Sequence, residues 1–313
     1  MCEHVPVLVE EVLEWLGCNP GGIYVDCTVS LGGHARAILE RIHPSGRLIA
    51  IDADAEALTE AEKRLCAWKE SVTYVRDNFR NLEWILRRLG VKHADGILFD
   101  LGMSSAQVGS ASRGFSLYKS GPLDMRFDRG QSLTAAEIVN RYPEKEIVKI
   151  IREFGEERAA RRIARAIVQR RERSEVSSTD ELAELVSGVM GPRRRGIHPA
   201  TRTFQALRIA VNREIESLEQ ALPQAIEALN PGGRLVVLSY HSLEDRVVKQ
   251  TFRQFEKGCI CPPSFPVCRC GRVSEIEVLT KKPIRPAPGE IRENPRSRSA
   301  KMRVCERKRK ENM

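Results

Sequence analysis

The sequence predicts an α/β fold, a doubly wound sheet of seven strands with an all-helical segment inserted into it. Three observations lead to this prediction. Short apolar runs alternate with helical patterns up to about Asp100, the alternation stops between about Ser104 and Val211, and it resumes from there toward the C-terminus. The 42% of hydrophobic residues is enough to build a buried core, which excludes wholesale disorder.

The first alternating region supplies four strands, each ending in a turn or an acidic residue. We expect them at Ile23–Thr28, Arg47–Asp52, Val72–Asp77 and Asp95–Asp100. Helical patterns lie before and between them, near Val7–Leu16, His34–Ile42, Ala55–Trp68 and Leu82–Leu89. Helices of this length allow the crossovers that parallel strands require.

The middle of the chain contains helix signals and no strand-like run. Thr134 with Glu137, and Ser178 with Glu181, have the spacing of a capping box, and Pro199 suits the first turn of a helix reaching about Val211. We therefore predict three segments: residues 1–103, an inserted helical domain at 104–214, and residues 215–313, which complete the first domain.

The alternating pattern returns after this insertion. A helix at Ile215–Leu229 leads to a turn at Pro231-Gly232-Gly233 and a strand at Arg234–Tyr240. A helix at Leu243–Phe255 follows, and strands at Val273–Thr280 and Ala300–Glu306 form a terminal hairpin.

The charge distribution suits a polyanionic partner. The net charge is +9, Arg158–Arg173 holds seven arginines with one acidic residue, and Arg292–Met313 holds nine basic and three acidic residues. The first cluster is also typical of the solvated face of an amphipathic helix around Ile163 and Ile167. No secretory signal or membrane span of about 18 apolar residues is apparent, so we expect a cytoplasmic protein without membrane contact.

The nine cysteines do not suggest a disulfide framework. Four of them, Cys259, Cys261, Cys268 and Cys270, lie within twelve residues and could hold a tetrahedral zinc ion. Their C-x-C spacing differs from the usual C-x-x-C, and a redox-inert or partly oxidised loop is the alternative. The sequence leaves this open, and we assign no metal ligand from it.

Polar and glycine residues follow all four of the first strands, at the edge where doubly wound sheets bind ligands. Gly32, Gly33 and His34 open a helix after the first strand, and Asp52 ends the second. Asp77-Asn78-Phe79 follows the third strand, and Asp100 to Gln107 follows the fourth. Each tip has a structural alternative, a tight turn or a helix cap, but together they predict a nucleoside cofactor. The glycines do not form G-x-G-x-x-G, which disfavours a nicotinamide cofactor.

Several longer motifs resemble the bacterial 16S ribosomal RNA (cytosine-N4)-methyltransferase family over nearly the whole chain. They are His4–Leu8, Gly32–His34, Asp95–Gly102, Arg113–Ser116, Gly121–Arg126, Gly155–Glu157, His198–Arg208, His241–Arg246 and Asn294–Ser299. The resemblance implies a class I methyltransferase sheet and S-adenosylmethionine bound by Gly32, Gly33, His34, Asp52, Phe79, Asp100 and Gln107. It also implies a cytidine substrate in the decoding region of 16S ribosomal RNA, within the small subunit.

The sequence departs from the family at Ser30, where a glycine is usual. Serine is expected to keep the turn if its φ is negative, at a small cost in cofactor affinity. The sequence does not determine the oligomeric state, and a homodimer is one of the alternatives.

The chemistry favours an exocyclic amine over carbon C5 as the methylated atom. Methylation at C5 needs a cysteine nucleophile, and no Pro-Cys pair of the usual kind or cysteine after the fourth strand is present. An amine instead needs positioning and a proton acceptor. Asp100 is the candidate catalytic acceptor, with a cofactor contact as the alternative role.

The candidate substrate-binding residues lie in three places. His241, Glu244 and Asp245 follow the fifth strand, where Ser242 and the acids could instead cap a helix. Asp124 and Arg126 could hold the nucleotide or pair with each other. Arg296 and Arg298 are expected to contact phosphates. Arg202 and Arg208 are expected near RNA-facing surfaces, and Phe204 and Leu207 in the core.

Two other classes of function compete with this hypothesis. A non-catalytic RNA-binding or assembly factor could keep the pocket as a relic, but the glycine and acidic residues at the strand tips argue against it. A nicotinamide-dependent oxidoreductase lacks the glycine spacing. Calorimetric titration with S-adenosylmethionine and with NADH would separate the three.

Overall fold

The structure is a computed structural model that describes residues 6–191, 198–257 and 269–309, together with Cys259, Cys261, Pro262, Phe265 and Val267. Residues Cys268, His4 and Val5, which the sequence analysis singled out, lie outside the described residues. The chain divides into two compact units. One comprises Met1–Gly102 and Ile215–Met313, and the other comprises Met103–Glu214.

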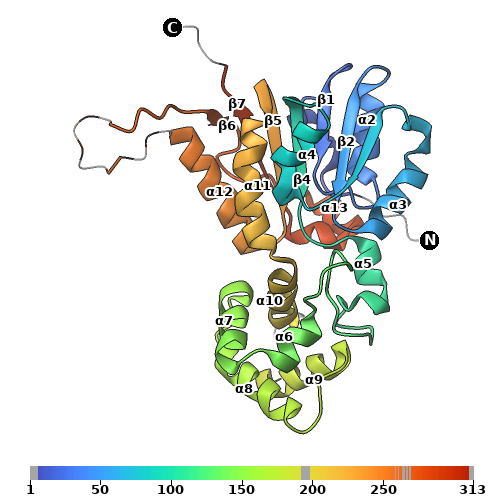
Figure 1. Ribbon diagram of the computed structural model, residues 1–313, viewed down its shortest axis with the longest axis vertical. Helices are drawn as coiled ribbons and strands as arrows, with labels where there is room; N and C mark the ends of the chain where they lie inside the picture. The colour runs from blue at the N-terminus through green and yellow to red at the C-terminus, as the bar shows by residue number, and fades with distance from the viewer. Residues whose placement is uncertain are drawn as a thin grey trace. The chain divides into compact units, whose positions relative to one another are not determined.

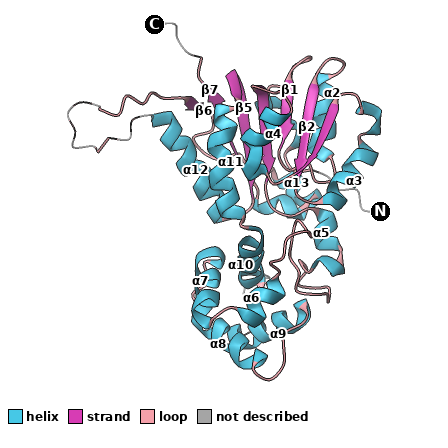
Figure 2. Ribbon diagram, in the orientation of Figure 1, coloured by secondary structure: helices cyan, strands magenta, loops and turns pink. Residues whose placement is uncertain are grey.

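The first unit is built on a seven-stranded sheet, shown in magenta in Figure 2. Its strands are β1 (Ile23–Asp26), β2 (Arg47–Asp52), β3 (Val72–Arg76), β4 (Ala94–Asp100), β5 (Leu229–Ser239), β6 (Ile276–Val278) and β7 (Lys301–Arg307). The order is β3-β2-β1-β4-β5-β7-β6. The first five strands in that order are parallel, and β7 is antiparallel to both of its neighbours. This confirms the predicted α/β class and the terminal hairpin.

Helices cover both faces of the sheet (Figure 1). On one face lie α1 (Val9–Leu16), α2 (Gly33–Ile42) and α3 (Ala55–Arg64), and on the other lie α4 (Leu82–Arg88), α11 (Glu214–Glu227) and α12 (Ser242–Lys257). Residues of one strand alternate between the two cores: Leu48 and Ala50 pack with the first group, and Ile49 and Ile51 with the second. Strands that are buried on both faces have continuous apolar sequences, and for this reason they could be predicted from the sequence.

Strand β5 differs from the prediction because it contains the predicted turn. Ala94 pairs with Leu229 and Gly96 pairs with Arg234, so Asn230–Gly233 bulges from the strand without ending it. Gly232 takes a φ of 85°, and the Asn230 side-chain amide donates to Asp95 Oδ1 at 2.8 Å. The glycines do permit a sharp bend, but the strand pairing continues on both sides of it.

Several element ends also differ from the prediction. Helix α1 begins at Val9 because Leu8 has a φ of 54°, and α3 ends at Arg64 with a short 3₁₀ helix, η1 (Cys66–Trp68), after it. Strand β6 is limited to Ile276–Val278. The segment after it holds α13 (Pro288–Glu293) and η4 (Pro295–Ser299).

The second unit is helical in its described residues, which contain no named strand and one isolated bridge between Pro122 and Ser178. Its helices are α5 (Ser105–Gly109), α6 (Ala135–Arg141), α7 (Glu144–Gly155), α8 (Ala160–Arg171), α9 (Thr179–Met190) and α10 (Thr201–Asn212). They enclose their own core, which includes Ile163, Ile167, Phe204 and Leu207 as expected. A separate core lets this unit hold its shape from its own contacts.

The predicted caps have mixed outcomes. Thr134 accepts a hydrogen bond from Glu137 N as expected, whereas Ser178 makes no side-chain cap bond and its hydroxyl donates to the Asp180 carboxylate instead. The reciprocal capping box occurs at Ser104 and Gln107.

None of the helices in the described parts of the chain is both long and apolar enough to span a bilayer.

Candidate active site at the strand tips

Three carboxylates gather at the carboxyl ends of adjacent parallel strands. Asp26 ends β1, Asp52 ends β2 and Asp100 ends β4. In the register, Asp26 pairs with Ala50 of β2 and Leu98 of β4, each two residues before its strand's last aspartate. The three acids therefore share one edge of the sheet, as the sequence predicted for Asp52 and Asp100.

Asp100 is held by three neighbours. The Tyr240 hydroxyl donates to Asp100 Oδ1 at 2.7 Å, and Nδ1 of His34 lies 3.4 Å from Oδ2. The Asp100 amide donates to Thr28 Oγ1 at 2.6 Å. These contacts fix the carboxylate in one orientation, and each of its oxygens keeps lone-pair capacity for one further donor.

Both ring nitrogens of His34 face hydrogen-bond acceptors. Its Nε2 lies 2.9 Å from the Val7 carbonyl, and its Nδ1 faces Asp100, so each ring nitrogen meets an acceptor. Burial lowers the pKa of His34, but the hydrogen bond and charge of Asp100 and the charge of Asp26 outweigh it, and the pKa is raised above its usual value. An imidazolium with two acceptors is satisfied, whereas a neutral ring would leave one contact repulsive.

Asp26 and Asp52 are not paired with a cationic side chain in the way that Asp100 is paired with His34. Burial raises the pKa of Asp26 to about 7, and the charges of Asp100 and Asp52 add to this against the opposing effects of His34 and the Thr28 amide. Burial also raises the pKa of Asp52 to about 6, although it accepts hydrogen bonds from Ser30 N at 2.8 Å and Asp54 N at 2.9 Å. The strand tips thus carry an excess of negative charge.

The glycine loop bends more sharply than the sequence analysis assumed. Ser30 has a φ of 51°, so the turn is kept although the condition of a negative φ is not met: a serine occupies the left-handed conformation. The bond from Ser30 N to Asp52 Oδ2 fixes this conformation. Gly32, with a φ of 80°, is the N-cap of α2, and a Cβ on Gly33 would come within 2.9 Å of Pro6. Both glycines are therefore required by the backbone.

Phe79 lies at the third tip, in the 3₁₀ helix η2 (Phe79–Asn81), and packs edge-on against Phe99 with ring centroids 5.4 Å apart. Its ring is only partly buried, which leaves part of an aromatic surface beside the strand ends. Gln107 belongs to the second unit, where its side chain accepts from the Ser104 amide at 2.9 Å.

The residues after β5 divide into two roles. Glu244 is buried, and its Oε2 accepts from Tyr240 N at 2.8 Å and His241 N at 3.3 Å, so it caps the start of α12. His241 Nε2 is 3.1 Å from Glu244 Oε1 but not aligned for a hydrogen bond. Asp245 accepts from Lys301 Nζ at 3.0 Å and Arg303 Nε at 2.6 Å, and it joins α12 to β7. Burial opposes these two cations, which nonetheless hold its pKa below the usual value.

In the second unit, Asp124 and Arg126 bind each other. Two parallel hydrogen bonds of 2.8 Å join the guanidinium to the carboxylate, and Arg126 also donates to the carbonyls of Arg129 and Gln131. This is the loop clamp that the sequence analysis kept as the alternative. Arg208 is also internal: it is buried and forms a bidentate pair with Glu214, so its expected place on an RNA-facing surface is wrong.

Arg296 and Arg298 lie on η4, and both are exposed. Ser297 between them is buried, and its hydroxyl donates to the Asn294 carbonyl at 2.8 Å. The turn is therefore anchored through Ser297 while the two arginines face solvent.

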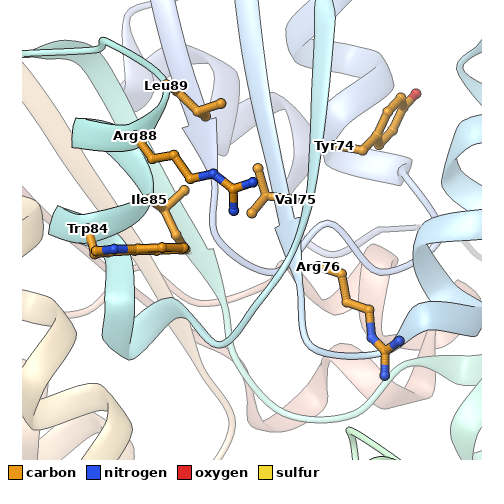
Figure 3. Close-up of a pocket in the computed structure, with 7 residues that line it drawn as sticks. All are labelled: Tyr74, Val75, Arg76, Trp84, Ile85, Arg88 and Leu89. Carbon is orange, nitrogen blue, oxygen red and sulfur yellow. The ribbon is translucent and has the colours of Figure 1, made fainter.

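A pocket of about 240 Å³ lies elsewhere, between β3 and α4 (Figure 3). Its lining residues are Tyr74, Val75, Arg76, Trp84, Ile85, Arg88 and Leu89. The Arg88 guanidinium stacks over the half-exposed Trp84 ring at 5.4 Å. None of the predicted site residues lines this pocket, so we do not identify it with the strand-tip site.

Sequence reasoning missed three members of the tip cluster. Asp26 and Thr28 were noted only as part of the first loop, and Tyr240 only as the last residue of a strand. The signal for Asp26 and Tyr240 was positional, because each lies at the end of a parallel strand beside a tip that had been recognised.

The residues at this edge fit S-adenosylmethionine. Its sulfonium and ammonium groups are cationic, which matches the excess negative charge of Asp26, Asp52 and Asp100. The Ser30 hydroxyl is buried with no hydrogen-bond partner among the described residues, so a polar group of a ligand can complete it. The amino end of α2 and its glycines allow close approach of a ligand carboxylate to free N–H groups.

Comparison with known proteins agrees with this geometry. The model of the MraW methylase family matches residues 1–308. Ribosomal RNA small subunit methyltransferase H of Brevibacillus brevis is 49% identical over 306 residues, which cover 97% of this chain and 98% of the relative. The enzyme of the same name from Symbiobacterium thermophilum is 50% identical over 303 residues, covering 96% and 95%. The chain therefore belongs to the MraW methylase family.

Proposed function

We propose that this chain transfers a methyl group from S-adenosylmethionine to the N4 amine of a cytidine in the decoding region of 16S ribosomal RNA. The relatives at about 50% identity are named for methylation of small-subunit ribosomal RNA. The observation that carries the proposal is the oriented Asp100 carboxylate among Tyr240, His34 and Thr28, at the tip of the central strand β4.

The cofactor residues have separable tasks in this proposal. Asp52, whose carboxylate already orders the first loop through Ser30, accepts bonds from the ribose hydroxyls. Gly32 gives the loop its left-handed turn at the amino end of α2, Gly33 lets Pro6 approach closely, and His34 keeps Asp100 oriented. Phe79 offers its ring to the adenine, and Gln107 of the second unit adds a polar contact.

The reaction needs no covalent bond between the protein and the substrate. Bound S-adenosylmethionine supplies an electrophilic methyl group, and the carbon–sulfur bond breaks as a carbon–nitrogen bond forms. The N4 amine loses one proton, which Asp100 accepts through whichever oxygen faces the base. The Tyr240 hydroxyl bond and the His34 contact keep that oxygen in place, so the residues act mainly by positioning.

The described cysteines argue against methylation at C5. Cys27, directly after β1, is the cysteine nearest in sequence to the tip residues, and it is fully buried. Burial, with the charge of Asp26 adding to it, raises its pKa well above the usual value, so its thiolate is scarcely populated. A cytosine C5 methyltransferase needs an accessible thiolate, whereas an amine nucleophile needs none.

We assign the remaining predicted residues to RNA. The helical segment 104–214 presents the substrate, with Asp124 and Arg126 shaping one of its loops. His241 and Glu244 border the cytosine from the fifth tip, Asp245 holds that segment to β7, and Arg296 and Arg298 contact phosphates.

The test is mass spectrometry of ribosomal RNA. A strain lacking the gene is expected to lose one methyl group from a cytidine of the decoding region, and the wild-type gene is expected to restore it. The fragment ions must place the methyl group on N4. A methyl group on C5 or on the ribose, or unchanged RNA, would contradict the proposal.

The substrate form is resolved in vitro with the same chain. Purified protein is incubated with labelled S-adenosylmethionine and either free 16S RNA or isolated small subunits. Transfer to the subunit but not to free RNA places the reaction late in assembly, and the reverse places it early.

A further inference from the structure

Three cysteine thiols come together in the segment between α12 and β6. The Sγ atoms of Cys259, Cys261 and Cys270 all lie within 4.8 Å of one another, and none of the three residues is in a disulfide. Cys259 and Cys261 follow the end of α12, whereas Cys270 comes from the other side of the segment. The loop therefore folds back to bring thiols from its two sides together.

The described residues of the segment form no apolar core that would explain this convergence. Phe255 before it and Ile276 after it are buried, but every described residue from 256 to 275 is exposed or only half-buried. Its apolar side chains face solvent: Phe265 is 48% exposed, Val267 69% and Val273 74%. In Figure 1 the described part of the segment extends away from the sheet. Ordering a chain costs about 1–2 kcal/mol per residue, which here must come from a source other than burial.

The separation of the sulfur atoms fits a shared metal ion. Sγ of Cys259 and Sγ of Cys270 are 3.8 Å apart. Ligands at ~2.3 Å from a tetrahedral zinc ion lie roughly 3.8 Å from each other. A disulfide would require ~2.05 Å.

The surroundings also suit a metal-bound sulfur. The Arg269 amide points at Sγ of Cys261, 3.3 Å away, and an amide of this kind supports a metal-bound sulfur. Lys257, Arg269 and Arg272 belong to the same segment and offset the negative charge of a thiolate-rich centre. Cys259 is positioned at the turn after α12 through its amide, which donates to the Lys257 carbonyl at 2.8 Å.

We propose that Cys259, Cys261 and Cys270 bind one zinc ion, which orders the segment between α12 and β6. The ion is structural: its ligands lie after α12 and before β6, apart from the aspartates at the strand tips. Zinc supplies the stabilisation that the segment lacks, because its binding free energy becomes folding free energy. The three thiolates leave one of the four tetrahedral positions for a further ligand.

The experiment measures metal in the full chain, purified without a metal-affinity tag and under reducing conditions. Elemental analysis is expected to find about one zinc per chain. Replacement by Co²⁺ is expected to give the visible bands of tetrahedral thiolate coordination. Zinc below about a tenth of an equivalent after growth in zinc-supplemented medium, or a disulfide among these cysteines, would overturn the proposal.

Variants provide a matched comparison. Cys259→Ser and Cys270→Ser are each expected to lower the zinc content at least about tenfold, whereas Cys66→Ser, at an exposed cysteine on η1, is expected to leave it unchanged. Calorimetric affinity for S-adenosylmethionine should stay the same in all three variants, which separates this proposal from the proposed function. Zinc retained in both loop variants would refute these ligands.

Proteolysis adds a readout that needs no catalytic activity. Trypsin is expected to cut after Arg269 and Arg272 at least about tenfold faster once a chelator has removed the ion, because metal binding and local folding are coupled. Cutting rates that do not respond to the chelator would show that zinc does not order the segment.

Discussion

The acidic residues at the strand tips and those in the helical unit differ in whether a neighbouring cation compensates their negative charge. Asp26 is buried and Asp52 is half-buried, and desolvation outweighs their favourable contacts and raises their pKa values to about 7 and about 6. Asp124 is also largely buried, but the bidentate bonds from Arg126 lower its pKa despite burial. Asp26 and Asp52 can therefore bind a cationic ligand, whereas the carboxylate of Asp124 is already paired and stabilises its own loop.

Asp100→Asn gives the largest expected effect. The amide keeps the size of the side chain but cannot accept a proton, so methyl transfer should fall by about 10²- to 10⁴-fold. Single-turnover transfer to small subunits, at saturating cofactor, measures this. Cofactor affinity within about threefold of wild type would assign Asp100 to the proton step. A loss confined to cofactor affinity would instead support the contact role that was its alternative.

Asp52→Ala should weaken cofactor binding by about 1.5–3 kcal/mol, or roughly 10- to 150-fold, because charge-assisted bonds to the ribose are lost. Isothermal titration measures the change. Asp54→Ala is the matched control: Asp54 caps α3 through Glu56 N, so its loss should affect stability more than binding. Equal affinity in Asp52→Ala and wild type would remove Asp52 from the site.

Asp124→Ala tests whether the ion pair between Asp124 and Arg126 is structural. Removing the carboxylate leaves Arg126 without its partner and should lower the free energy of unfolding by on the order of 2 kcal/mol. Chemical denaturation monitors this, with cofactor affinity expected to stay unchanged. A stable variant that had lost only RNA methylation would show that Asp124 contacts the substrate and that the clamp is secondary.

The raised pKa values predict a pH dependence with a defined sign. A folded-state pKa above the unfolded value means that the folded chain binds the proton more tightly. The resulting stabilisation is complete below the unfolded pKa near 3.8 and is lost as the pH rises through about 6 for Asp52 and about 7 for Asp26. The ligand-free protein should therefore lose this contribution progressively between about pH 4 and about pH 7.

A cationic ligand should reverse that trend, because it favours the ionised acids. Affinity for S-adenosylmethionine should rise by roughly three- to tenfold from pH 5.5 to pH 8. S-adenosylhomocysteine, which lacks the sulfonium charge, should show a smaller rise. Parallel pH curves for the two ligands would contradict the charge argument.

Arg296 and Arg298 give the smallest expected effect. Both are exposed, so replacing them together by alanine should reduce the salt slope of RNA binding by roughly one to two units and leave cofactor binding unchanged. Fluorescence anisotropy across a salt series measures the slope. An unfolded double variant would show that η4 depends on the arginines and that they give no information about the RNA path.

The fold could be predicted from the sequence because its strands are buried on both faces. Runs such as Ile97, Leu98 and Phe99 are apolar throughout, and an aspartate marks where several of them end. The bulge in β5 escaped prediction because Pro231-Gly232-Gly233 has the local signature of a turn. Only the pairing of Leu229 with Ala94 and of Arg234 with Gly96 shows that the strand continues.

The sequence allowed us to predict where the site residues lie, but not which side chains they bind. Asp52 and Asp100 follow strands, so their place at one edge could be inferred. The bond between Asp100 and Tyr240 joins residues 140 apart, and no local pattern encodes it. For the same reason neither the substrate contact nor the helix-end role considered for Asp245 included its partners Lys301 and Arg303, which lie near the end of the chain. The φ of Ser30 depends on its bond to Asp52, which is also a tertiary contact.

The pairing of β4 with β5 has a consequence for synthesis of the protein. Strand β4 is complete at Asp100, but its partner begins only at Leu229, after the whole helical unit has been translated. At ~5–20 residues per second, the ribosome takes on the order of ten seconds to supply that partner. During this time the nascent chain carries an unpaired strand edge flanked by the apolar Ile97 and Phe99, a surface that invites aggregation. We expect premature stops within the helical unit to give insoluble fragments, and folding of the sheet to be completed only as the last strands leave the ribosome.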